Sequence, residues 1–364
     1  MNRERPVIFI AGGGTGGHVF PGLAVAEAAR SIADVDVVFV GTARGLESKL
    51  VPERGYSLEL LDVLPLKGGG ALRAAKGLFA AARASGASVS LLRRRRPRAV
   101  LSVGGYAAGP VSLAAAALGI PVAVLEPNSV TGLANRWLSR FCSRAYIAFP
   151  TVEKDFAAKK VRRFGVPLRA GFQADPYVAR ESLRLLVLGG SLGARAINDR
   201  IPEVALRLRA TFPALSILHQ TGKDEVARTE EAYARAGVSD VSVVPFISDV
   251  PKEIAAADVV VSRAGAGSVS EICAIGRASV LIPFPHAADD HQATNAKTVA
   301  EQGGAVWMRQ EAADVARLTG ELSRILGDAE LRTEMATRAR KFGRPEAAKT
   351  IAEDLLALAR VSTR

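Results

Sequence analysis

Short apolar runs rich in β-branched residues alternate with amphipathic stretches along the whole chain. The runs have the length of buried strands, and the stretches between them have the length of helices. Strands that alternate with helices predict parallel sheets joined by right-handed crossovers, and near-continuous apolar strands are typical of sheets covered on both faces. The expected strands are Val7–Ala11, Val35–Val40, Ser57–Leu61, Ala99–Val103, Val122–Leu125, Ala145–Ala148, Leu185–Leu188, Leu215–His219, Val241–Val244, Val259–Ser262 and Ser279–Ile282.

The strand-and-helix pattern starts again near residue 184. An apolar strand, a Gly-rich loop and a helix start follow one another over Pro6–His18, and the same order returns over Arg184–Arg195. This order opens a Rossmann-like unit, and a length of 364 residues suits two domains. We therefore predict an α/β chain with an N-terminal domain over residues 1–165 and a C-terminal domain over residues 166–345. A C-terminal helix in residues 346–364 could pack back on the first domain.

The charge of the chain is uneven. Residues 1–165 carry 23 Lys and Arg against 11 Asp and Glu, whereas residues 166–364 carry 25 of each, so the net charge of +12 lies entirely in the first half. Between Asp62 and Glu126 there are nine basic residues and no acid. Such a field favours an anionic partner: a membrane surface, a nucleic acid or a phosphorylated substrate.

The cysteines and the uncharged segments restrict the cellular locations that the sequence is compatible with. Cys142 and Cys273 are too few to staple a chain of this size, and no Cys-x-x-Cys spacing exists for zinc, which indicates a reducing, cytosolic compartment. Residues 99–125 contain no charge and match the length of a membrane span, but Gly and Pro interrupt them, so we predict strand, loop, helix and strand there. The apolar run Val7–Ala11 is too short for a signal peptide.

Gly-rich loops follow three of the predicted strands, at Gly12–Gly17, Gly104–Gly109 and Gly189–Gly193. Glycine lets backbone amides approach a phosphate, and the helix start after each loop adds partial positive charge. A tight turn explains one such loop equally well, but three in one chain indicate a phosphorylated ligand. The first loop satisfies the dinucleotide fingerprint, yet Phe39–Arg44, at the tip of the second strand, lacks the required acid. With no P-loop present either, we predict no cofactor.

His18 directly follows the first Gly-rich loop and lies at a predicted helix start. Open α/β sheets bind ligands at the carboxyl ends of their strands, which is where this residue should lie. A helix N-terminus disfavours the charged imidazole, so the ring stays able to accept a proton. We weigh a catalytic or substrate-contacting role equally with a structural, capping role.

In the second half, small residues follow another apolar strand, at Ser262–Glu271. They leave room for a ligand, and Glu271 could accept hydrogen bonds from both hydroxyls of a ribose; the alternative is a carboxylate that merely favours the helix dipole. Gln292 and Asn295 lie one turn apart on the next predicted helix and suit sugar hydroxyls. Asp289–His291 match no standard metal spacing, so we predict no metal.

Six segments resemble, in order and spacing, the motifs of the MurG family of peptidoglycan N-acetylglucosaminyltransferases: GGGTGGHVFPGLAVAE, SVGGYAAGP, EPNSVTGLANRWL, LGGSLGAR, SRAGAGSVSE and DDHQATNA. The resemblance implies the GT-B fold, with two Rossmann-like domains whose parallel sheets face across a cleft. It implies inverting transfer of GlcNAc from UDP-GlcNAc to the C4 hydroxyl of undecaprenyl-pyrophosphoryl-MurNAc-pentapeptide (lipid I), which forms lipid II. The implied location is peripheral, at the cytoplasmic face of the bacterial inner membrane. The implied partners are UDP-GlcNAc, lipid I, the anionic membrane surface and other cell-wall enzymes, with no nucleic acid.

The same resemblance assigns roles to individual residues. In residues 1–165 it places Thr15, Gly16, Gly17 and Asn128 at the donor and Gly104, Gly105 and Tyr106 in an acceptor loop, and just beyond them it places Arg169 at the diphosphate. In the second half it assigns phosphate to Ser191, uracil to the backbone of Ile247, the nucleotide to Ala266, Gly267, Ser268, Val269 and Ser270, the ribose to Glu271, and the GlcNAc hydroxyls to Gln292 and Asn295. The chain departs from the family where Val166 replaces the usual Asn and His291 a frequent Gln.

Basic and apolar residues interleave over residues 67–96, which predicts a peripheral membrane patch. The alternative is a solvated basic helix with an ordinary apolar face. The residues concerned are Lys67, Arg73, Lys76, Arg83 and Arg93–Arg96, with Leu72, Leu78, Phe79, Leu91 and Leu92.

Two rival functions belong to other classes. Another UDP-sugar enzyme of the same fold, such as a natural-product glycosyltransferase or a UDP-GlcNAc 2-epimerase, would share the second half and differ in the first-half loops. A nucleic-acid-binding protein without chemistry would use only the basic half. Interleaved aromatic residues would support that reading, but residues 63–125 contain only Phe79 and Tyr106.

Overall fold

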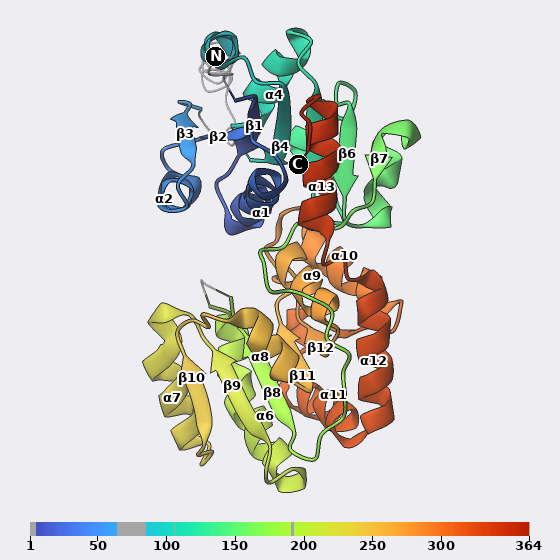
Figure 1. Cartoon of the computed structure of the whole chain (residues 1–364). Helices are drawn as coiled ribbons and strands as arrows, with labels where there is room; N and C mark the ends of the chain where they lie inside the picture. Colours follow the sequence, from blue (N-terminus) through green and yellow to red (C-terminus); the bar gives the residue numbers. More distant parts are fainter. Residues whose placement is uncertain (1–4, 64–84, 106, 191–192, 364) are drawn as a thin grey trace. The chain divides into compact units, whose positions relative to one another are not determined.

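The computed structural model describes residues 5–63, 85–105, 107–190 and 193–363. The chain forms two compact units, one of Met1–Arg169 with Glu346–Arg364 (unit 1) and one of Ala170–Pro345 (unit 2). Each unit is a parallel sheet with helices on both faces (Figure 1). The first crossing between the units therefore falls at Arg169, a few residues beyond the position expected from the sequence.

Unit 1 contains a seven-stranded sheet in the order β3-β2-β1-β4-β5-β6-β7, and all its neighbouring strands are parallel. Its strands are β1 (Val7–Gly12), β2 (Asp36–Gly41), β3 (Ser57–Leu60), β4 (Ala99–Gly104), β5 (Val122–Glu126), β6 (Arg144–Ile147) and β7 (Val161–Arg162). Its helices include α1 (Gly16–Ile32), α2 (Glu47–Glu53), α4 (Ala108–Ala117), α5 (Leu133–Leu138) and α13 (Ala347–Leu358), with 3₁₀ turns at Pro150–Asp155 and Ala158–Lys160.

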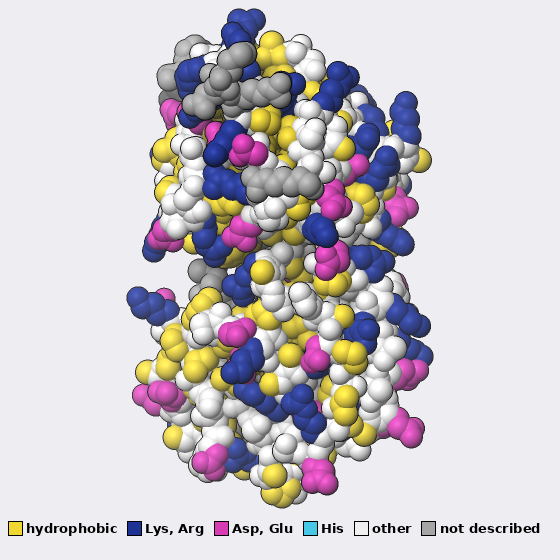
Figure 2. All heavy atoms as spheres, in the orientation of Figure 1, with side chains coloured by type: hydrophobic (Ala, Val, Ile, Leu, Met, Phe, Trp, Pro, Cys, Tyr) yellow, Lys and Arg dark blue, Asp and Glu magenta, His cyan; other side chains and the backbone are white. Residues whose placement is uncertain are grey.

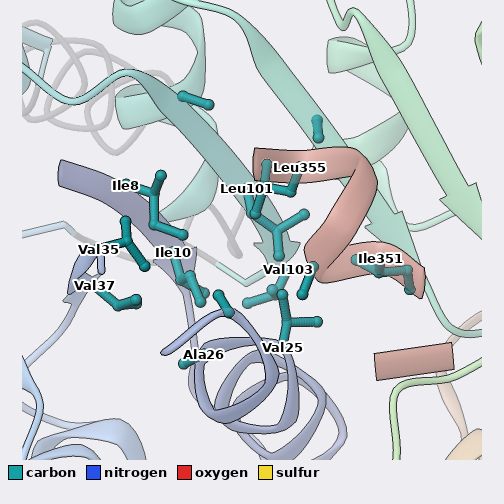
Figure 3. Packing of buried hydrophobic residues seen from close by; sticks show 14 of the residues in the cluster. Ile8, Ile10, Val25, Ala26, Val35, Val37, Leu101, Val103, Ile351 and Leu355 are labelled. Carbon is teal, nitrogen blue, oxygen red and sulfur yellow. The ribbon is translucent and has the colours of Figure 1, made fainter. Parts of the chain in front are cut away.

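The C-terminal helix α13 is part of the core of unit 1. Ile351 and Leu355 are fully buried and pack with Val25 of α1 and Leu101 of β4 (Figure 3). Burying an aliphatic side chain of this size contributes about 1.5–3 kcal/mol. A polar contact adds to this packing, because Asp354 of α13 accepts a hydrogen bond from the Tyr146 hydroxyl at 2.7 Å. Burial and this carboxylate raise the pKa of Tyr146, which stays protonated.

Unit 2 contains a six-stranded parallel sheet in the order β10-β9-β8-β11-β12-β13. Its strands are β8 (Arg184–Leu188), β9 (Ser216–Gln220), β10 (Val241–Val244), β11 (Val259–Ser262), β12 (Ala278–Leu281) and β13 (Val306–Trp307). Its helices are α6 (Arg195–Thr211), α7 (Val226–Arg235), α8 (Val250–Ala256), α9 (Ala266–Ile275), α10 (His291–Ala300), α11 (Val315–Gly327) and α12 (Ala329–Phe342), with 3₁₀ turns at Lys223–Glu225, Ala288–Asp290 and Gln310–Ala312.

The segment before β8 belongs to unit 2 because a buried arginine holds it there. Arg277 is 1% exposed, donates to the Asp175 carbonyl at 2.7 Å and also pairs with the Asp175 carboxylate. Two residues further on, the Tyr177 hydroxyl donates to Asp258 at 2.5 Å. These long-range contacts explain why the first unit ends where it does, and the strand pattern alone does not contain them.

In both sheets the order in which the chain adds strands reverses beside the central strand, while all strands stay parallel. In unit 1 the chain builds β1, β2 and β3 outward and then returns to place β4 on the other side of β1. Unit 2 repeats this with β8, β9 and β10 followed by β11 beside β8. Ligands of open α/β sheets bind outside the carboxyl ends of the strands at such switch points. The loops after β1 and β4, and those after β8 and β11, are therefore where each unit should bind its ligand.

Two edge strands, β7 and β13, were not expected from the sequence. Each has only two residues, at Val161–Arg162 and Val306–Trp307, so neither forms an apolar run long enough to stand out. In the part of the chain that the structure describes, no helix is long and apolar enough to span a bilayer.

Candidate active site

The two Gly-rich loops of unit 1 contact each other at the switch point between β1 and β4. The Gly13 amide donates to the Gly104 carbonyl at 3.1 Å. A Cβ on Gly12 would lie 2.0 Å from that carbonyl oxygen, and one on Gly105 would lie 2.3 Å from the Gly13 oxygen. Gly12 and Gly105 have φ values of +136° and +89°, which side chains rarely adopt. These glycines are thus required by backbone contact, and Tyr106 lies outside the described residues.

A carboxylate that sequence analysis did not single out lies beneath the first loop. Glu47, at the start of α2, is 1% exposed and accepts hydrogen bonds from the amides of Gly14 at 2.6 Å and Thr42 at 2.9 Å. The Thr42 hydroxyl donates to it at 3.0 Å. Its sequence signal is weak: Gly41 and Gly45 flank it, and a Cβ on either would lie within 2.5 Å of a Glu47 atom.

The internal carboxylate changes which amides of the first loop are open to a ligand. The Gly14 and Thr42 amides are taken by Glu47. The first-turn amides of α1, at Gly16 and Gly17, have no acceptor within the helix. Thr15 and Gly17 are exposed and Gly16 is half-buried. A phosphate that binds this loop should therefore meet the start of α1 rather than the loop centre.

His18 is half-buried in the first turn of α1, and its ring lies against Gly104. Its Nδ1 lies 3.2 Å from the Gly13 carbonyl oxygen and 3.4 Å from the Thr15 hydroxyl. Because a carbonyl only accepts, Nδ1 carries the proton of the neutral ring, and the lone pair is on Nε2. The contact thus selects the tautomer in which Nε2 can accept a proton.

Asn128 is held in a third loop at the carboxyl edge of the same sheet, after β5. Its amide donates to Glu126 at 3.1 Å, and the other Glu126 oxygen accepts from the Gly132 amide at 2.9 Å and the Asn135 side chain at 3.0 Å. Burial raises the pKa of Glu126, and the hydrogen bonds partly offset this. The buried carboxyl thereby fixes the backbone that carries the half-buried Asn128.

In unit 2 the loop after β8 is built on backbone contacts. The Gly189 amide donates to the Gln220 carbonyl at 2.9 Å, and a Cβ on Gly193 would lie 2.4 Å from the Thr221 oxygen. Asn198 of α6 donates to the same Thr221 carbonyl at 3.0 Å. Ser191, to which we assigned phosphate, lies outside the described residues, so its role stays a prediction.

A buried histidine supports this loop from below. His219 Nε2 lies 3.1 Å from the Asn198 side-chain oxygen, and its Nδ1 lies 3.0 Å from the Tyr233 hydroxyl. Burial lowers the pKa of His219 to about 3. This histidine is therefore neutral and structural.

The start of α9 divides the expected nucleotide residues into two groups. Ala266, Val269 and Ser270 are buried, whereas Gly267, Ser268 and Glu271 are half-buried. Gly267 and Glu271 are four residues apart and share one face of the helix. The accessible side of α9 therefore combines a residue without a side chain with a carboxylate, and Val269 and Ser270 contribute to packing.

The two residues expected at GlcNAc differ in exposure. Gln292 is half-buried and accepts a hydrogen bond from the Phe284 amide at 3.0 Å. Asn295 is 0% exposed and donates to the Ala264 carbonyl at 3.1 Å, next to the start of α9. In this structure Asn295 supports the loop after β11, and a direct sugar contact by its side chain stays a prediction. His291 lies 2.6 Å from the Ala288 carbonyl of its own turn.

Two further predicted contacts depend on the backbone or on the connecting segment. Ile247 is 6% exposed, and its amide donates to the Gln220 side chain at 3.3 Å. Its carbonyl is thus the backbone group that can accept from the uracil N3–H while this hydrogen bond is kept. Arg169, the last residue of unit 1 before the crossing, is half-buried. Within the described ranges no cluster of three His, Cys, Asp or Glu is arranged to hold a metal ion.

Comparisons with known proteins show the family to which the chain belongs. The glycosyltransferase family 28 N-terminal domain matches residues 8–147, and the family 28 C-terminal domain matches residues 184–351. With two Rossmann-like units, the chain is thereby defined as a glycosyltransferase of the GT-B class.

The relatives place it more narrowly. It is 49% identical to the UDP-N-acetylglucosamine--N-acetylmuramyl-(pentapeptide) pyrophosphoryl-undecaprenol N-acetylglucosamine transferase of Sorangium cellulosum (strain So ce56), over 97% of this chain and 88% of the relative. The crystal structure of MurG from Acinetobacter baumannii matches with a TM-score of 0.81 and 33% identity, over 97% of this chain and 99% of that one. The chain belongs to the MurG family.

The chain is also similar to the solved structure of the glycotransferase of kitacinnamycin. It matches with a TM-score of 0.69 over 98% of this chain and 100% of that one, but only 17% of residues are identical. That likeness shows the fold alone.

Proposed function

We propose that this chain transfers N-acetylglucosamine from UDP-N-acetylglucosamine to the C4 hydroxyl of MurNAc in undecaprenyl-pyrophosphoryl-MurNAc-pentapeptide. The product is lipid II, and the configuration at the transferred sugar carbon is inverted. The observation that carries the proposal is membership of the MurG family, whose Sorangium cellulosum member is 49% identical over 97% of this chain. The position of His18 at the unit 1 switch point supports it.

Each unit supplies a different part of the reaction. Unit 2 binds the nucleotide sugar through the loop after β8 and the accessible face of α9, where Glu271 accepts from the ribose hydroxyls. In unit 1, Nε2 of His18 takes the proton of the acceptor hydroxyl while that oxygen attacks the anomeric carbon from the side opposite UDP. Loop amides and helix N-termini stabilise the charge that develops on the departing UDP.

One assay tests the reaction directly. The protein is incubated with UDP-[¹⁴C]GlcNAc and a short-chain lipid I analogue, and label is measured in the lipid product. We expect label there only when both substrates are present. Free labelled GlcNAc or a labelled epimer without lipid product would instead support another UDP-sugar enzyme of this fold.

We further propose that unit 1 attaches peripherally to the anionic cytoplasmic face of the bacterial inner membrane. Its described surface carries many Lys and Arg side chains, which in Figure 2 line the upper and right-hand margins of unit 1. Residues 85–95 are helical, and Arg93–Arg96 at their end are exposed. Arg94 and Arg95 pair with Glu59 of β3 at 3.3 Å and 2.7 Å. Arg93 and Arg96 are therefore the better candidates to meet lipid phosphates.

The apolar part of the expected membrane patch needs a correction. Leu91 and Leu92 are 4% and 1% exposed and pack in the core with Val111 of α4, so they are not available for insertion. Exposed apolar side chains of unit 1 lie elsewhere, and Trp137 and Phe141, at 66% and 57% exposure, are two of them. Residues 64–84, which hold the rest of the predicted patch, lie outside the described residues.

Replacing Arg93 and Arg96 together by glutamine should weaken binding to anionic vesicles about thirtyfold, because each basic residue near such a surface contributes about 1 kcal/mol. Sedimentation with phosphatidylglycerol-containing vesicles at low salt measures this, and UDP affinity should not change. Lys252→Gln with Lys341→Gln, both exposed in unit 2, removes the same charge and serves as the control. Equal losses in both double variants would show that net charge, not this surface, drives attachment.

A further inference from the structure

Glu47 and His18 form hydrogen bonds with opposite ends of the same peptide group, the one that joins Gly13 and Gly14. The Gly14 amide of that group donates to Glu47 Oε2 at 2.6 Å, and its Gly13 carbonyl lies 3.2 Å from His18 Nδ1. A trans peptide is planar, with its N–H and C=O pointing in opposite directions. A carboxylate that fixes the N–H therefore also fixes the direction of the carbonyl.

We propose that Glu47 is a positioning residue that holds His18 in its Nδ1–H tautomer through the peptide group between Gly13 and Gly14. The inference rests on the proposed function, in which Nε2 of His18 accepts the proton of the acceptor hydroxyl. Glu47 itself touches no substrate in this scheme. In many enzymes a third group, often a carboxylate, orients the catalytic histidine by direct contact. Here Glu47 acts on His18 indirectly, through one peptide group.

The charge of Glu47 strengthens the contact to His18. Hydrogen bonds to an ionised acceptor are shorter and stronger than neutral ones, and 2.6 Å to the Gly14 amide fits that kind of bond. Bonds in a chain polarise one another, so a carboxylate on the N–H makes the Gly13 carbonyl a better acceptor. The lone pair of the neutral imidazole is thereby kept on Nε2, which is the atom that a base needs.

The loop fold alone does not explain a carboxylate at this position. In the described part of the corresponding loop of unit 2, Gly189 is held by the Gln220 carbonyl and Asn198 by the Thr221 carbonyl. That loop, too, follows a central strand and precedes a helix, and these contacts involve no carboxylate. Of these two loops, the one that carries His18 is therefore the one in which a described backbone amide is held by a buried carboxylate.

Glu47→Gln is the sharpest test because it keeps the size of the side chain and removes the charge. Its amide NH₂ only donates, so one of the two former oxygen positions meets a donor from Gly14 or Thr42. Glu53→Gln is the matched control: it makes the same change in the same helix, α2, at an exposed residue. The readouts are kcat and KM for both substrates, UDP affinity, and ¹⁵N NMR of the His18 ring, assigned by loss of its signals in His18→Gln.

For Glu47→Gln we expect kcat to fall about 10–100-fold, by analogy with the loss seen when groups that orient a metal-binding histidine are removed. UDP affinity should stay within twofold, and the ¹⁵N shifts of neutral His18 should move away from the Nδ1–H pattern. Glu53→Gln should match the wild type. A folded Glu47→Gln variant with unchanged kcat, or with an unchanged His18 tautomer, overturns the proposal.

The wild-type spectrum tests the proposal even if Glu47→Gln does not fold. A neutral His18 protonated at Nε2 in the wild type would contradict it directly. The result also separates this inference from the reaction on which it rests. If His18→Ala abolishes turnover while Glu47→Gln does not, only the positioning role of Glu47 is refuted. Normal turnover by His18→Ala would refute the catalytic role of His18 itself.

Discussion

Replacing His18 by alanine is expected to lower kcat by about a hundredfold or more, with little change in the KM for UDP-GlcNAc. Proton removal by a placed base is typically worth about 10²–10⁴-fold. The geometry favours this role, since Nδ1 of His18 is engaged by the Gly13 carbonyl and Nε2 carries the lone pair. His18 lies at the start of α1, beside the switch point of unit 1, which is where open α/β sheets act on their ligands.

The pH dependence distinguishes a base from a binding residue. A base must be neutral, so kcat of the wild type should fall at acidic pH, and this acidic limb should be absent in His18→Ala. UDP affinity, a property of unit 2 in our scheme, should not change, and the melting temperature checks that unit 1 of the variant is folded. Near-normal kcat with a raised KM for the lipid acceptor would make His18 a binding residue and would refute the catalytic assignment.

The positions of most strands were predictable because each central strand is a continuous apolar run. Val35–Val40 and Val259–Ser262, for example, correspond to β2 and β11 with shifts of at most one residue. Such runs can be recognised in the sequence because helices cover both faces of a parallel sheet, so that the residues on both sides of each strand are apolar. The Gly-rich loops could also be recognised in the sequence, because close backbone contact, as between Gly12 and Gly104, leaves no room for a side chain.

Side-chain direction was much harder to predict than the strands. Leu91 and Leu92 were predicted to face the membrane because four arginines follow them in the sequence. They point into the core instead, because α4 packs on that side of their helix. Asn295 was assigned to the GlcNAc hydroxyls, which stays a prediction, and the structure adds a contact that the pattern did not show, from its side chain to the Ala264 carbonyl. In both cases the deciding neighbour is distant in sequence, so no local period reveals it.

Glu47 was missed for a related reason. A single acid in a short helix resembles an ordinary solvated residue, and no spacing rule connects it to His18. Its role becomes visible only when β1, β2 and α2 are assembled and its carboxylate lies under Gly14. The structure thus adds to the candidate site mainly the groups that hold the ligand-facing residues in place.

Replacing Glu271 by alanine should weaken UDP binding by about one to two powers of ten. A hydrogen bond to a charged acceptor contributes about 1.5–3 kcal/mol, and each 1.4 kcal/mol is a tenfold change in affinity. Glu271 shares the accessible face of α9 with Gly267, which has no side chain to block a ligand, while Ala266 and Val269 anchor the helix in the core. Titration calorimetry with UDP measures the change.

Two further variants make the Glu271 result specific. Glu271→Gln keeps one acceptor oxygen and loses the charge, so its affinity should lie between wild type and Glu271→Ala. Glu230→Ala, at an exposed position on α7 of the same unit, removes the same charge and should leave affinity unchanged. Comparing UDP with 2′-deoxy-UDP locates the contact: if Glu271 binds the ribose, removing the 2′ hydroxyl should cost the wild type more than Glu271→Ala. An equal penalty in both proteins, or unchanged UDP affinity in a folded Glu271→Ala, would reject the ribose role.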